Sequence, residues 1–189
     1  MVTKEKVTKR LEGLRTVLVI IVAIFTIIAV ITIVQKKRDA RPFNYRTYPE
    51  SVMITNGTSF RLDTIAKVLA YDVFDIREID LKIYYLPEQD DESEIEFSGF
   101  VQKLPFGEHK YLILLNKKLS FSKMKEVLSH EFVHIDQYER GDLIVSGKTY
   151  IWKGEPGVVT TYDTSLPFET EAFKSQYNVK KELERYIYE

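Results

Sequence analysis

The sequence predicts an α+β domain that follows one N-terminal transmembrane helix. Three observations support this prediction: a long apolar run near the start, a series of short β-rich runs in the middle, and two long helical patterns in the second half. The chain has 189 residues and no cysteine. It is therefore long enough to bury a core without disulfide bonds.

The apolar run covers residues 16–35, which are all uncharged and are bounded by Arg15 and Lys36. A helix of this length rises about 30 Å, the thickness of the hydrocarbon core of a bilayer. The run passes directly into basic residues rather than into the small residues of a cleavage site, which favours an uncleaved anchor over a signal peptide. We expect the following organisation: a basic tail over 1–15, a transmembrane helix over 16–35, a juxtamembrane linker over 36–48 and a compact domain over 49–189.

The charges around this run give less information about orientation. Lysine and arginine are equally frequent on its two sides, so the positive-inside rule does not decide which side faces the cytoplasm. A single anchor near the N-terminus commonly leaves the long C-terminal part outside, and we expect a single-pass membrane protein with an extracytoplasmic domain and with lipid as a partner of 16–35. Residues 42–189 carry 18 basic and 25 acidic side chains, a net charge of −7, which argues against nucleic acid as a partner.

The middle of the chain predicts one short helix and several strands. Apolar residues recur at helical spacing over Leu62–Tyr71, and the acidic stretch 88–94 has the composition of a solvated hairpin loop. The β-rich runs are Leu81–Leu86, Ile95–Val101, Tyr111–Leu115, and a later hairpin made of Leu143–Val145 and Thr149–Trp152.

His130, Glu131 and His134 form the strongest motif of the chain. The two histidines are four residues apart in a segment with helical spacing that begins near Ser120 and ends at Gly141, so both rings lie on one face of the helix. Two imidazoles at this spacing can bind one metal ion, and Glu131 is turned away from them, as suits a carboxylate that takes a proton from water. The alternative is a pair of core histidines that are hydrogen-bonded to their neighbours.

A catalytic zinc ion needs a third protein ligand and an open position for water. The three-histidine form of the motif is excluded, because Gln137 and Arg140 stand where it requires glycine and histidine. Glu169 is the favoured third ligand, since it shares the apolar stripe of a final helix that Pro167 opens. Glu171 and His109 remain alternatives.

The pattern His-Glu-Phe-Val-His, followed 35 residues later by Glu169-Thr-Glu-Ala, resembles the gluzincin group of zinc metallopeptidases. The resemblance covers two helices and is greatest to the small, compact domains of this group. It implies a zincin-like metallopeptidase fold over 49–189, with Zn²⁺ held by His130, His134 and Glu169. Phe173 stands where many members carry an aspartate that orients a histidine ligand.

The resemblance also implies a function. We expect a zinc-dependent peptidase that cleaves a peptide or protein substrate, with Glu131 as the general base. In such a fold the strand that enters the active helix, here Tyr111–Leu115, is expected to form a sheet edge for the substrate. Tyr150 and Tyr162 are conceivable donors of an additional hydrogen bond to the reacting oxygen. The alternative function is a tethered domain that binds zinc or a partner without cleaving it.

Overall fold

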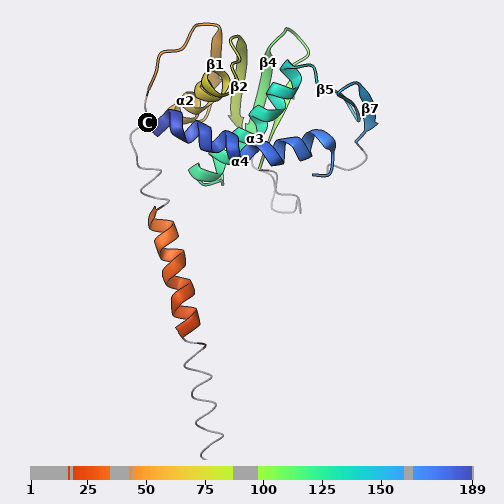
Figure 1. The fold of residues 1–189 in the computed structure, drawn as a ribbon. Coiled ribbons are helices and arrows are strands. Elements are labelled where there is room, and N and C mark those ends of the chain that lie inside the picture. The colour runs from red at the N-terminus through yellow and green to blue at the C-terminus, as the bar shows by residue number, and fades with distance from the viewer. Residues whose placement is uncertain are drawn as a thin grey trace, which may run out of the picture. The chain divides into compact units, whose positions relative to one another are not determined.

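The computed structural model describes residues 17, 19–34, 43, 45–86, 98–159 and 164–188. The chain divides into two compact units, Met1–Arg41 and Pro42–Glu189, which are drawn in Figure 1. The acidic stretch 88–94 lies outside the described residues, as do residues 95–97 of one predicted strand and Tyr162.

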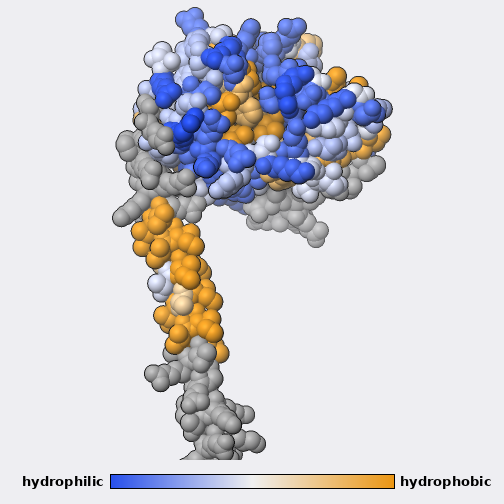
Figure 2. Space-filling view, in the orientation of Figure 1, coloured by the Kyte–Doolittle hydropathy of each residue, from blue (hydrophilic) through white to orange (hydrophobic). Residues whose placement is uncertain are grey.

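The first unit contains a helix whose described, continuous part covers residues 19–34. Its side chains are exposed, and the face turned to the viewer in Figure 2 is mostly apolar. Within the described residues, every helix falls short of the length or the apolar character required to cross a membrane. The prediction of a transmembrane helix over 16–35 is therefore wrong, and so is the single-pass membrane location that rested on it.

The second unit has an α+β fold, as the sequence predicted. Its main sheet has the strand order β1-β2-β4-β3, in which β1, β2 and β4 are parallel and β3 is antiparallel to β4. Figure 1 shows α2, α3 and α4 on one side of this sheet. The elements of the sheet and its helices are β1 (Val52–Asn56), α2 (Phe60–Val68), the π-helical turn Leu69–Val73, β2 (Ile79–Tyr85), β3 (Gly99–Lys103), β4 (Lys110–Leu115), α3 (Phe121–Glu139) and α4 (Pro167–Tyr188).

The core lies between the helices and the sheet. Alternate residues of β2 and β4 are buried, while their neighbours in sequence are less covered, so one face of the sheet packs and the other is partly open. Phe43 also belongs to this core, because its ring packs against Phe121 of α3 and Tyr188 of α4. Helices α3 and α4 lie on the same side of the sheet and pack against each other. This packing brings the two predicted ligand segments together.

The edge strand next to α3 differs from the prediction. Tyr111–Leu115 was expected to form the sheet edge, but β4 lies between β2 and β3. The expectation is wrong because β3 folds back antiparallel onto the outer side of β4 and takes the edge position itself. This places β3 beside α3, the helix that carries His130 and His134.

A second, smaller sheet follows α3. It consists of three antiparallel strands, β5 (Leu143–Ser146), β6 (Thr149–Trp152) and β7 (Glu155–Val158). The first two are the predicted hairpin, whose turn contains Gly147 with a positive φ of 59°. The third strand was not predicted.

Candidate metal centre

Helix α3 presents His130 and His134 to the interior. The helix begins after Ser120, whose hydroxyl accepts a hydrogen bond from the main-chain N–H of Lys123, as an N-cap residue does. The two histidines lie one turn apart and are 8% and 5% exposed. Their Nε2 atoms are 3.2 Å apart. The helical spacing of the motif therefore brings both rings to one buried point, as predicted.

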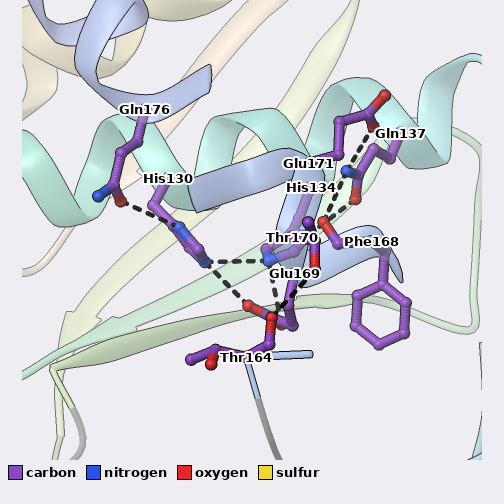
Figure 3. Close-up of polar contacts among 9 residues, drawn as sticks. All are labelled: His130, His134, Gln137, Thr164, Phe168, Glu169, Thr170, Glu171 and Gln176. Carbon is purple, nitrogen blue, oxygen red and sulfur yellow. Dashed lines mark hydrogen bonds and ion pairs between the residues drawn. The ribbon is translucent and has the colours of Figure 1, made fainter. Parts of the chain in front are cut away.

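Glu169 completes the group from the first turn of α4. Its carboxylate is 2% exposed, with one oxygen 3.2 Å from Nε2 of His130 and the other 3.3 Å from Nε2 of His134 (Figure 3). The ligand atoms of the three residues lie within 4.8 Å of one another. A buried set of two imidazoles and one carboxylate can hold a metal ion. Such an ion would also compensate a carboxylate that is otherwise costly to bury.

Glu131 lies on the same helix but is not part of this group. It is 4% exposed, and burial raises the pKa of its carboxyl group above the usual value, against the opposing charges of His134 and His130. The main chain of Val101 in the edge strand acts in the opposite direction and favours the charged form of Glu131. Glu131 is therefore held between the metal group and the strand, where a proton acceptor could act on a molecule bound at both.

The position of Val101 follows from the register of the edge strand. The bonds from Leu104 N to Lys110 O and from Asn116 N to Ser98 O show that even-numbered residues of this segment pair with β4. The main-chain groups of Gly99, Val101 and Lys103 therefore point to the free edge. The main chain of Val101, which influences Glu131, therefore belongs to this free edge.

Two glutamines orient the histidine rings. Nδ1 of His130 lies 3.1 Å from Oε1 of Gln176, and Nδ1 of His134 lies 2.8 Å from Oε1 of Gln137. The amide nitrogen of Gln137 donates to the main-chain oxygen of Phe168 at 3.0 Å, so its oxygen must be the atom that faces His134. Each ring then donates from Nδ1 and keeps the lone pair of Nε2 for the centre.

The sequence interpretation missed both glutamines. It noted that Phe173 replaces the usual orienting aspartate, and the structure places the Phe173 ring against His130, with ring centroids 4.5 Å apart. Gln176, three residues further along α4, takes over the hydrogen bond. The available signals were positional: Gln137 follows His134 by three residues, and Gln176 follows Glu169 by seven, so each pair shares a helix face.

The two alternative third ligands lie elsewhere. Glu171 accepts hydrogen bonds from Gln137, Arg140 and Lys153 on the outer side of the group. These partners hold the pKa of Glu171 below its usual value, although burial acts in the opposite direction. His109 lies at the end of the loop before β4, with Nδ1 2.6 Å from a carboxylate oxygen of Glu139.

A cavity of about 520 Å³ opens beside the metal group. Its lining combines the reactive residues with an apolar wall from the edge strand and the small sheet. The residues are Gly99, Phe100, Val101, Glu131, His134, Tyr138, Leu143, Val145, Gly147, Lys148, Val159, Phe168 and Glu169. Tyr150 is absent from this lining, and its ring packs against Phe168 instead.

No family model, curated protein or solved structure matches this chain. Buried residues His130, His134 and Glu169 form a group that can bind a metal ion.

Proposed function

We propose that the second unit is a zinc-dependent peptidase of the gluzincin type. The observation that carries the proposal is the convergence of His130, His134 and Glu169 at one buried point, with Glu131 beside them at the cavity. The resemblance of the motif and the placement of its residues support the same function independently, because the motif alone does not bring Glu169 to the histidines.

The ligand set favours zinc among the common metals. Zinc binds imidazole nitrogen and carboxylate oxygen at about 2.0–2.1 Å in a tetrahedral arrangement, which separates neighbouring ligand atoms by about 3.3 Å. The two Nε2 atoms are 3.2 Å apart, and each lies 3.2 or 3.3 Å from a different oxygen of Glu169, while one ligand atom from each residue lies within 4.8 Å of the others. The residues present therefore fit a tetrahedral ion once one oxygen of Glu169 turns towards it, and three protein ligands leave one position open.

The cavity supports a peptide as the substrate. Its wall is mainly apolar and its polar groups are concentrated at the centre, an arrangement typical of a site that buries a side chain next to a reacting group. The free main-chain groups of Gly99 and Lys103 at the sheet edge can pair with an extended chain. Both features suit a polypeptide better than a small polar molecule.

The roles of the residues follow from this placement. Bound zinc would polarise the scissile carbonyl group and make a nearby water molecule more acidic. Glu131 accepts a proton from that water, whose oxygen forms a bond to the carbonyl carbon. When the carbon–nitrogen bond breaks, Glu131 passes the proton to the departing amine. Gln137 and Gln176 keep His134 and His130 oriented throughout.

The test uses the full-length protein and two variants of α3. Glu131→Gln removes the proton acceptor, whereas Glu126→Gln changes a glutamate on the outer face of the same helix. We expect about one zinc per chain in all three proteins, and cleavage of a peptide library by the wild type and Glu126→Gln but not by Glu131→Gln. Zinc bound by all three with cleavage by none would contradict the peptidase function and favour a domain that binds without cleaving.

A further inference from the structure

Tyr138 lies on the reactive face of α3. It follows His134 by four residues and Glu131 by seven, so all three project from the same side of the helix. Tyr138 lines the cavity together with Glu131, His134 and Glu169. A phenol group thus belongs to the same wall as the residues that would bind the metal and move the proton.

The ring of Tyr138 is held in place while its hydroxyl group remains available. The ring packs against Tyr111 with centroids 6.1 Å apart, and it contacts the hydrophobic core. Tyr111 donates its own hydroxyl to Glu139, but the Tyr138 hydroxyl makes no hydrogen bond to any residue that the structure describes. Among the described residues, every fully buried polar side-chain atom has a hydrogen-bond partner, so a hydroxyl without one cannot be fully buried. The hydroxyl is therefore accessible to solvent, on a residue that lines the cavity.

The electrostatic surroundings keep this hydroxyl protonated. Burial, followed by the negative charges of Glu131 and Glu169, raises the pKa of Tyr138 to about 12. The phenol is consequently a neutral hydrogen-bond donor over the whole physiological range.

We propose that Tyr138 is a further catalytic residue, whose hydroxyl donates a hydrogen bond to the oxygen of the scissile carbonyl group as negative charge develops there. This inference rests on the proposed peptidase function. The water oxygen bonds to the carbonyl carbon, the π-electron pair moves onto the carbonyl oxygen, and Tyr138 stabilises that charge without giving up its proton. Because the ring is already packed against Tyr111, the donor costs little reorganisation when the charge appears.

The proposal replaces the two tyrosines that the sequence suggested for this role. Tyr162 lies outside the described residues, and Tyr150 is not among the residues that line the cavity. Tyr138 was not among the tyrosines that the sequence suggested. The structure adds the cavity and the accessible hydroxyl.

The test compares Tyr138→Phe with two control variants of the full-length, zinc-loaded protein. Tyr138→Phe keeps the ring and removes the hydroxyl. Tyr177→Phe changes a tyrosine that is 73% exposed on α4, and Tyr150→Phe tests the earlier candidate. We expect Tyr138→Phe to lower kcat about 100- to 1,000-fold with KM changed less than about threefold, as for loss of one donor to the reacting oxygen. Zinc content and thermal unfolding should match the wild type, and both control variants should remain active.

A second measurement separates failure of this inference from failure of the peptidase function. An uncleavable peptide phosphonate carries a tetrahedral, negatively charged oxygen at the position of the scissile carbonyl. Its affinity should fall in Tyr138→Phe by a factor similar to the fall in kcat/KM. Equal affinity for both proteins, or a loss seen only in KM, would overturn the role of Tyr138. Absence of cleavage by the wild type would instead overturn the peptidase function, and with it the catalytic role.

Discussion

The side-chain oxygen of Gln137 lies 2.8 Å from Nδ1 of His134, and the nitrogen of the same amide is tied to Phe168 O and to Glu171. The amide therefore cannot turn over without losing two hydrogen bonds. His134 is fixed by a neutral group from its own helix, which is itself fixed by α4. The docking of α4 thus delivers Glu169 and also sets the orientation of a histidine on α3.

Replacing Gln137 should weaken metal binding although Gln137 touches no metal. Gln137→Ala frees the His134 ring, and loss of such an orienting partner typically costs about 10- to 100-fold in metal affinity. Competition for zinc against a coloured chelator measures this change. Gln102→Ala, on the exposed side of β3, is the control and should bind zinc as the wild type does. Unchanged affinity in Gln137→Ala would show that the amide does not position the ring.

Glu169 and Glu171 should differ sharply in metal binding, although they are two residues apart. Glu169→Gln removes the charged ligand and should lower zinc affinity by more than about 100-fold, beyond the effect of an orienting residue. Glu171→Gln should lower it less, because Glu171 contacts only Gln137 and surface cations. Zinc should also raise the Tm of the wild type and of Glu171→Gln but not of Glu169→Gln, since only a bound ligand stabilises the folded state. The opposite order would assign the third ligand to Glu171.

Gly99 lets the edge strand approach the active helix. A Cβ atom at this position would lie 2.7 Å from Cγ1 of Val127 and 3.1 Å from the main-chain oxygen of Leu114. Gly99→Ala should therefore lower the free energy of unfolding by about 1–3 kcal/mol, measured by urea denaturation. Val127→Ala removes the closest atom, so the double variant should be more stable than the sum of the two single changes implies. If the two changes in unfolding free energy simply add, the strand and the helix do not meet at Gly99.

Glu126 should make stability depend on pH in the acid range. Burial acts to raise its pKa, but the hydrogen bond and charge of Lys123 and the charge of Lys180 outweigh it and lower the pKa below 4.5. Because the folded pKa is the lower one, the contribution of Glu126 is complete above the unfolded value near 4.5 and is lost as the pH falls through the folded value.

Urea unfolding of the wild type and Glu126→Gln at a series of pH values measures this contribution. The difference in unfolding free energy should be constant above about pH 6 and should shrink towards zero below about pH 4. A difference that grows on acidification would contradict the direction of the shift.

Local patterns predicted the elements that carry the site. The cap at Ser120, the spacing of the histidines and Pro167 at the start of α4 are all signals within a few residues, and the structure has these helices close to the predicted bounds. The inward position of Glu169 was also predictable, because it shares a helical stripe with buried residues such as Ala172.

The features that sequence reasoning missed depend on distant partners. Whether β4 or β3 forms the edge depends on strand pairing, which no local pattern in Tyr111–Leu115 contains. Gln176 resembles any glutamine on a helix surface until α4 docks and brings it to His130. The membrane span was inferred from composition over 16–35, whereas no helix of the described residues is long and apolar enough to cross a membrane.

The placement of Glu169 and Gln176 on the last helix also has a consequence for biosynthesis. Until synthesis reaches these residues, the nascent polypeptide contains the two imidazoles but lacks the carboxylate of the metal group. The centre can then mature only once the C-terminal segment has emerged and docked. A chain that ends before Glu169 therefore lacks the complete metal-binding group.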